Sequence, residues 1–116
     1  MQFGFFNFNT IHSFRPDDLA IALEGRGYDS LWLGEHTHIP VDQSTPYIID
    51  GDATPMPYAH IMDPLVSLMA AAGVTKTLKL ATGICLVIQR DPIVTAKEIA
   101  TLDVLSEGRV IFGIGA

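Results

Sequence analysis

Residues 78–114 read LKLATGICLVIQRDPIVTAKEIATLDVLSEGRVIFGI, and this stretch decides the fold of the chain. The apolar runs Leu78–Ile84 and Val110–Ile114 are short, as in strands that are buried on both faces. Between them, Asp91-Pro92 combines an N-cap carboxylate with a proline at the first helical position, and Gly108 marks the end of the helical segment. The stretch therefore predicts a strand, a helix and a strand, the repeating unit of parallel sheets.

Similar signals for the start of a helix occur nearer the N-terminus. Arg15-Pro16-Asp17-Asp18 and Asp63-Pro64 each place a proline at a helix start, beside acidic residues that suit the helix dipole or cap. The remaining elements predicted in this way are strands at Phe3–Phe8 and Ser30–Gly34, and helices that begin at Pro16 and Pro64 and end at Gly27 and Gly73. Because strands and helices alternate strictly, the sequence predicts an α/β fold with a parallel sheet and right-handed crossovers.

Apolar residues at helical spacing support each predicted helix. The residues that share a predicted buried face are Leu19, Ala22 and Leu23 in the first helix, Leu65, Leu68, Met69 and Ala72 in the second, and Ile93, Ala96, Ala100 and Val104 in the third. Ile99, Leu102 and Leu105 lie off this last stripe. The third helix is therefore predicted from its caps and its length.

These elements predict half of a barrel. Four parallel strands leave an unpaired edge, whereas a closed (β/α)8 barrel needs eight strands and about 250 residues. We therefore expect residues 1–116 to form the N-terminal half of a TIM-barrel domain, and the chain to be a fragment. The long connection at residues 35–61 follows the carboxyl end of a strand, where α/β folds bind ligands, and its composition favours an ordered binding loop. Its prolines and tyrosines are Pro40, Pro46, Pro55, Pro57, Tyr47 and Tyr58.

The composition is that of an ordinary globular domain, with 48% hydrophobic and 17% charged residues. A formal net charge of −6 argues against nucleic acids and anionic membranes as partners, because both are bound by basic patches. The N-terminus lacks the features of a secretory signal, and no apolar run approaches the roughly 20 residues of a membrane span. Cys85 is the only cysteine, which excludes an intrachain disulfide. We expect a cytoplasmic protein.

Glu35-His36-Thr37-His38 follows the second predicted strand directly, at the rim where parallel barrels carry their catalytic residues. A histidine here can transfer protons near neutral pH, and a neighbouring carboxylate can set its tautomer or charge. His36 is therefore the candidate catalytic residue, with Glu35 as its partner, whereas His38 is more simply explained as a solvated loop residue. As an alternative, His36-x-His38 is similar to the start of a metal site in amidohydrolase-like hydrolases.

Two glycine-containing strand ends carry weaker signals. The third predicted strand ends in Thr82-Gly83-Ile84-Cys85, where small residues would let a flat ring approach the backbone, although an ordinary strand exit has the same composition. Phe112-Gly113-Ile114-Gly115-Ala116 is similar to the start of a Gly-x-Gly phosphate turn, which makes a Rossmann dinucleotide-binding fold a third interpretation. Cys85 has no activating neighbour in the sequence, so we predict a packed thiol and not a nucleophile.

Several motifs resemble those of luciferase-like monooxygenases, in order and with compatible spacing over nearly the whole chain. They are Gly27–His36 (GYDSLWLGEH), Asp63-Pro64-Leu65 followed by Ala70-Ala71-Ala72, Leu78–Gly83 (LKLATG), and, most specifically, Arg90-Asp91-Pro92-Ile93 through Lys97 together with Ala100–Arg109 (ATLDVLSEGR). Within the family, the long loop with Ile39-Pro40 and Pro46-Tyr47 is most similar to members that use coenzyme F-420, a deazaflavin.

The resemblance implies a TIM-barrel oxidoreductase whose cofactor, coenzyme F-420 or alternatively FMN, lies over the carboxyl ends of the strands. Such an enzyme transfers a hydride to or from a small organic substrate, or oxygenates the substrate if FMN is used. Glu35 and His36 match the acid–histidine pair near the reactive ring, and Gly83-Ile84 matches a non-prolyl cis peptide that supports the ring. The expected cofactor contacts are Glu35, His36, Thr82, Gly83, Ile84 and Cys85. A non-catalytic luciferase-like subunit is a further alternative, and we expect a homo-oligomer.

Overall fold

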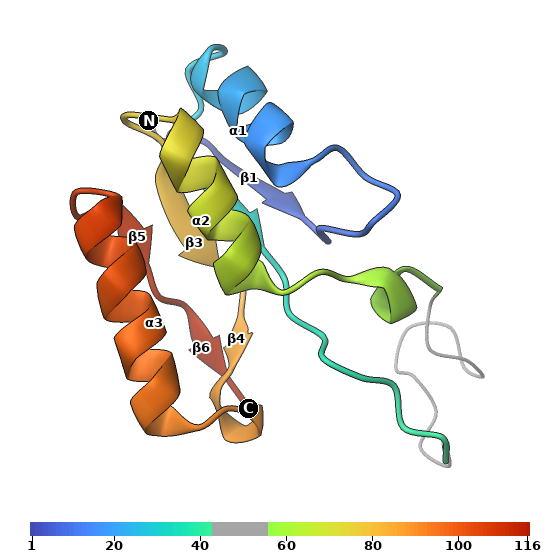
Figure 1. The fold of residues 1–116 in the computed structure, drawn as a ribbon. Coiled ribbons are helices and arrows are strands. Elements are labelled where there is room, and N and C mark those ends of the chain that lie inside the picture. Colours follow the sequence, from blue (N-terminus) through green and yellow to red (C-terminus); the bar gives the residue numbers. More distant parts are fainter. Residues whose placement is uncertain (43–55) are drawn as a thin grey trace.

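Four parallel strands form the main sheet of this computed structural model, which describes residues 1–42 and 56–116 (Figure 1). In spatial order they are β1 (Gly4–Asn7), β2 (Ser30–Leu33), β3 (Lys79–Thr82) and β5 (Val110–Ile111). A second parallel pair joins β4 (Cys85–Leu86) to β6 (Ile114–Gly115). The helices are α1 (Pro16–Glu24), α2 (Pro64–Val74) and α3 (Pro92–Leu105), with short 3-10 helices η1 (Met56–His60) and η2 (Val87–Gln89). The predicted α/β fold with a parallel sheet is therefore confirmed.

All three α-helices begin at the predicted prolines. The Asp63 carboxylate accepts a hydrogen bond from Val66 N at 3.0 Å, and the Asp91 carboxylate accepts one from each of two backbone N–H groups at 2.9 Å. The predicted end of α2 at Gly73 is wrong by one residue, because the helix continues through Gly73 to Val74. None of the helices in the described ranges is both long enough and apolar enough to cross a membrane.

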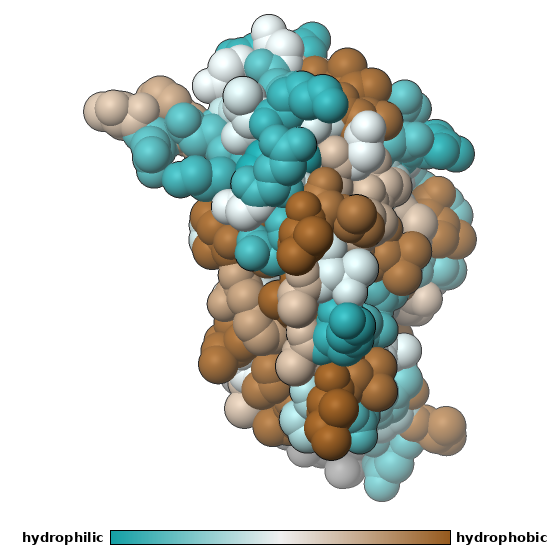
Figure 2. Space-filling view, turned by 60° about the vertical axis from the view of Figure 1, so that its left-hand side comes forward, coloured by the Kyte–Doolittle hydropathy of each residue, from teal (hydrophilic) through white to brown (hydrophobic). Residues whose placement is uncertain are grey.

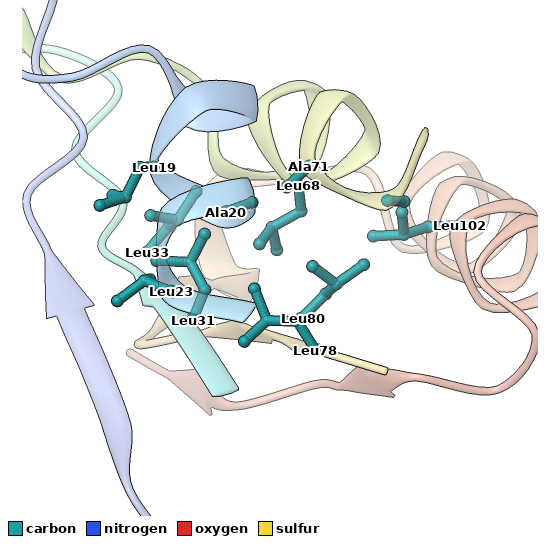
Figure 3. Close-up of a cluster of buried hydrophobic side chains, with 11 residues drawn as sticks. Leu19, Ala20, Leu23, Leu31, Leu33, Leu68, Ala71, Leu78, Leu80 and Leu102 are labelled. Carbon is teal, nitrogen blue, oxygen red and sulfur yellow. The ribbon is translucent and has the colours of Figure 1, made fainter. Parts of the chain in front are cut away.

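The hydrophobic core lies between the helices and one face of the main sheet (Figure 3). Leu31 and Leu33 of β2 and Leu80 of β3 point toward the helices and are fully buried. The helices contribute Leu19, Ala20 and Leu23 from α1, Leu68, Ala71 and Ala72 from α2, and Leu102 from α3. The alternate strand residues, including Phe6 and Trp32, which pair in the register of β1 and β2, lie on the opposite face of the sheet.

The predicted buried stripe of α3 is wrong. Its end residues Ile93 and Val104 are 81% and 76% exposed, whereas the side chains that α3 buries are those of Thr95 and Leu102. Apolar residues surround this helix on several sides, so periodicity alone did not distinguish the packed face. Large apolar side chains therefore remain on the surface among polar ones (Figure 2).

The third and fourth predicted strands are each interrupted near the carboxyl end of the sheet. A Cβ at Gly113 would overlap the carbonyl oxygen of Thr82, and a Cβ at Gly115 would overlap the side chain of Ile84. The Gly113 carbonyl oxygen accepts hydrogen bonds from the Thr82 hydroxyl at 2.7 Å and from Cys85 N at 2.8 Å. Close strand contact explains both glycines, and Gly115 lies in a strand, so the predicted phosphate turn and the Rossmann interpretation are not supported.

Candidate active site

β2 directs His36 to the carboxyl end of the sheet, three residues beyond Leu33, the last residue of the strand. The imidazole is partly buried, and its Nε2 atom is buried with no hydrogen-bond partner among the described residues. Burial, together with the nearby charge of His38, lowers the pKa of His36, so the ring is mostly neutral at neutral pH. A neutral imidazole with an unpartnered nitrogen can exchange a hydrogen bond or a proton with a bound molecule.

Tyr58 of η1 packs against His36, with ring centroids 4.9 Å apart and planes inclined by 67°. The same tyrosine ring meets Phe8 at 5.4 Å, and Phe8 in turn meets Phe6 of β1 at 5.3 Å. A row of aromatic rings therefore runs from the open face of the sheet to His36. Sequence reasoning placed Tyr58 in the binding loop but gave it no such contact, because the contact joins residues far apart in the chain.

The Glu35 carboxylate is held inside the protein, with its side chain 1% exposed. Oε1 forms an ion pair with Arg90 and accepts a hydrogen bond from Arg90 Nε at 2.7 Å. Oε2 accepts a hydrogen bond from Leu86 N at 2.6 Å. The acid that follows β2 is thus bonded to the segment that follows β3, and it anchors the start of the rim loop that carries His36.

Arg90 joins this site although sequence reasoning gave it no role beyond a family motif. Its side chain is 13% exposed and also contacts Asp63 at 2.6 Å and Glu98 at 3.6 Å. Burial disfavours its charge, but hydrogen bonds to Glu35 and Asp63 outweigh that cost and raise the pKa of Arg90 above its usual value. The only signal in the sequence was a basic residue directly before the Asp91-Pro92 helix start.

The third strand exit contains the cis peptide bond Gly83-Ile84, as the family resemblance predicted. Gly83 and Ile84 are partly exposed beside the rim, whereas the side chains of Thr82 and Cys85 are buried. Burial raises the pKa of Cys85 to about 11, with the neighbouring Glu35 carboxylate adding to the effect. Cys85 therefore carries a neutral, packed thiol, and Gly83 and Ile84 are the more exposed residues of this segment.

The rim loop after His36 borders two small cavities of about 260 and 170 Å³. His36, Thr37 and Ile61 line both of them. The Thr37 hydroxyl donates to Gln89 Oε1 at 2.5 Å and lies 2.9 Å from Nδ1 of the exposed His38. Pro46, Tyr47 and Pro55 of the predicted binding loop lie outside the described residues.

The whole chain, residues 1–116, matches the model of the luciferase-like monooxygenase family. The chain belongs to this family. An uncharacterized protein of Mycobacterium tuberculosis is 42% identical over 118 residues, which cover 99% of this chain and 42% of that protein. The chain therefore spans about two fifths of the length of this relative.

Two solved structures to which the chain is similar are associated with different cofactors. The coenzyme F420-dependent tetrahydromethanopterin reductase of Methanopyrus kandleri is 26% identical, with a TM-score of 0.67, and the match covers 98% of this chain and 26% of that one. The oxygenating constituent of 3,6-diketocamphane monooxygenase from Pseudomonas putida, in complex with FMN, is 25% identical, with a TM-score of 0.75 and coverage of 100% and 29%. Similarity alone therefore does not select the cofactor.

Membership in the luciferase-like family gives no support to the amidohydrolase-like alternative. Among residues 1–42 and 56–116, no group of three or more histidine, cysteine, aspartate or glutamate side chains could hold a metal ion. His36 and His38 also differ in environment, since His36 is partly buried against Tyr58 whereas His38 is exposed. The described part of the chain therefore does not present His36 and His38 within a cluster of metal ligands.

Proposed function

We propose that this chain supplies one side of the active site of an oxidoreductase that uses coenzyme F-420, with His36 as the proton-transfer group. The observation that carries the proposal is the buried Nε2 of His36 at the carboxyl end of β2, which has no hydrogen-bond partner in residues 1–42 and 56–116. A buried polar atom without a partner is costly, so such an atom at a strand rim favours a ligand that completes its hydrogen bonding. Gly83, at the exit of the neighbouring strand β3, adds a partly exposed residue without a side chain.

The residues at this rim fit a flat cofactor ring. An added Cβ at Gly83 would lie 3.5–3.6 Å from Trp32 and Phe6, which is an ordinary contact, so the protein itself does not require a glycine there. We infer that Gly83 and Ile84 face the ring and that His36 lies beside its reacting position. When bound, a deazaflavin supplies a hydride-carrying carbon.

The protein's own part in the reaction would be proton movement and placement. A neutral His36 can accept a proton at Nε2 as the substrate loses a hydride, and the protonated ring can return that proton as the substrate gains a hydride. The partial burial that lowers the pKa of His36 keeps the ring in its neutral, accepting form at neutral pH. Tyr58 restricts the orientation of the imidazole through its edge contact.

The preference for F-420 over FMN rests on the sequence similarity of the loop at residues 35–61 to F-420-dependent members, since the structural relatives include both an F420-dependent reductase and an FMN complex. We expect the apo-protein, expressed from its complete reading frame, to change its fluorescence on titration with F-420 and to respond weakly to FMN. Tight FMN binding without any response to F-420 would place the protein in the flavin branch and exclude a mechanism limited to hydride transfer.

Two variants separate binding from chemistry. His36→Asn should leave the affinity for the cofactor within a few-fold and slow turnover by about 10²–10⁴, the contribution of a general acid–base group. Gly83→Ala should instead weaken cofactor binding, because its methyl group fits the protein but meets the ring. Cofactor binding with a redox activity that is unchanged in His36→Ala would support the non-catalytic subunit.

A further inference from the structure

Arg90 is the point at which three separate segments of the rim meet. Its guanidinium contacts Glu35 after β2, Asp63 before α2 and Glu98 within α3. The Glu35 and Asp63 partners are 55 and 27 residues away in sequence. A planar guanidinium bonds two carboxylates in fixed directions from separate nitrogen atoms, whereas a lysine ammonium offers rotatable donors on a single nitrogen.

Two of the three carboxylates that Arg90 contacts, those of Glu35 and Asp63, also accept hydrogen bonds from backbone N–H groups. Glu35 Oε2 accepts from Leu86 N at 2.6 Å, and Leu86 follows the Gly83-Ile84 segment by two residues. Asp63 Oδ1 accepts from Val66 N and caps α2, while its Oδ2 contacts Arg90. Arg90 therefore fixes the loop that carries His36 and, through Glu35, the neighbouring exit of β3.

Removal of this guanidinium would leave the buried carboxylate of Glu35 without a positive partner. Its side chain is 1% exposed, and Asp63 shares the same cation, so loss of Arg90 would leave two carboxylates without their common partner. A buried carboxylate in that situation takes up a proton or moves toward water. Because Glu35 precedes His36 directly, such a movement would displace the imidazole as well.

We propose that Arg90 is a positioning residue of the reaction: by clamping Glu35 and Asp63, it holds His36 with Nε2 presented to the bound cofactor and substrate. Arg90 acts through Glu35 and does not itself touch the reacting groups. The inference rests on the proposed function for its effect on turnover, whereas its effect on the placement of His36 can be measured without any cofactor.

Arg90→Lys keeps the charge and loses the planar fork, and it is the first test. We expect kcat to fall at least ten-fold while the affinity for F-420 changes less than three-fold. We also expect the His36 imidazole to titrate at a higher pH in NMR spectra of the apo-protein, since a displaced ring would lose its burial. The resonance is assigned by its absence in His36→Asn.

A double variant that removes the Glu35 charge separates positioning from general destabilisation. Arg90→Met leaves the charge of Glu35 uncompensated. The double variant Arg90→Met/Glu35→Gln removes that charge, because glutamine is a neutral isostere of glutamate. We expect the double variant to recover at least five-fold in kcat over Arg90→Met, with the His36 titration returning toward that of the wild type. Where Arg90→Met does not fold, Asp63→Asn provides the same readouts, because asparagine still caps α2 and only weakens the contact to Arg90.

Arg109→Lys is the matched control. Arg109 also uses its whole guanidinium inside the protein, donating to the carbonyl oxygens of Ala72, Leu78 and Ser106 and to the Thr75 hydroxyl, all away from His36. The Arg109→Lys variant should have a lower melting temperature, but its kcat and the pH at which His36 titrates should be those of the wild type. If Arg90→Lys behaves in the same way, Arg90 is only structural and the inference is wrong. If the wild type shows no redox activity with F-420 or FMN, the proposed function fails, and the NMR titrations alone decide whether Arg90 positions His36.

Discussion

Replacing Glu24 with glutamine should destabilise the folded protein only at pH values where the carboxylate is charged. Glu24 ends α1, and its Oε1 accepts hydrogen bonds from the backbone N–H groups of Lys76, Thr77 and Leu78 at 2.9, 2.6 and 2.9 Å, and from the Thr77 hydroxyl at 3.0 Å. Desolvation favours the neutral form, but these hydrogen bonds outweigh it and lower the pKa of Glu24 from 4.5 to about 2. One carboxylate thus fixes α1 to the connection between α2 and β3.

The magnitude follows from the difference in pKa between the folded and unfolded chain. A change from 4.5 to about 2 corresponds to about 3.4 kcal/mol for a carboxylate fully shielded from water. Glu24 is only partly buried, so solvent screening reduces the expected contribution to about 1–2 kcal/mol. Because the folded-state pKa is the lower one, this stabilisation is complete above about pH 4.5 and is lost as the pH falls toward about 2.

Urea unfolding of the wild type and of Glu24→Gln, at about pH 7 and about pH 3, measures this effect. The difference in the free energy of unfolding should be about 1–2 kcal/mol at the higher pH and clearly smaller at the lower one. Glu107→Gln removes an exposed carboxylate and should show neither a large difference nor this dependence on pH. Equal stability of the wild type and Glu24→Gln at pH 7, or a difference that persists at low pH, would refute the reasoning.

Gly113→Ala should destabilise the protein by about 1–3 kcal/mol in thermal unfolding, because the new methyl group would overlap the carbonyl oxygen of Thr82. Gly73→Ala should stabilise it by about 0.5–1 kcal/mol, since Gly73 lies inside α2 and an added Cβ meets no described atom within 4 Å; a loss of stability would contradict this. Cys85 should resist a thiol reagent at about pH 8 in the native state and react after unfolding in urea, because burial raises its pKa to about 11. Rapid labelling of the native protein would show that the thiol is accessible.

The element order and helix starts could be predicted because the chemistry that sets them is local. Asp63 and Asp91 each accept hydrogen bonds from backbone N–H groups two or three residues further along the chain, so the cap and the helix start can be recognised together in the sequence. The orientation of α3 was not predictable in this way, because apolar residues lie on several sides of the helix and its neighbours decide which side packs. The cis peptide at Gly83-Ile84 was predicted only by resemblance to a family, not from local residue preferences.

The candidate site also has features that the sequence predicted and features that only the fold determines, and the difference affects its chemistry. Glu35 and His36 are adjacent in sequence, which suggested a pair in which the carboxylate sets the tautomer or charge of the imidazole. In the structure the Glu35 side chain is 1% exposed and bonded to Arg90, whereas His36 Nε2 has no partner among the described residues. Successive side chains of an extended segment point to opposite sides, so adjacent residues at a strand end meet different surroundings. We infer that the two residues have separate roles, in which the acid holds the loop to the protein and the histidine is left to act on the ligand.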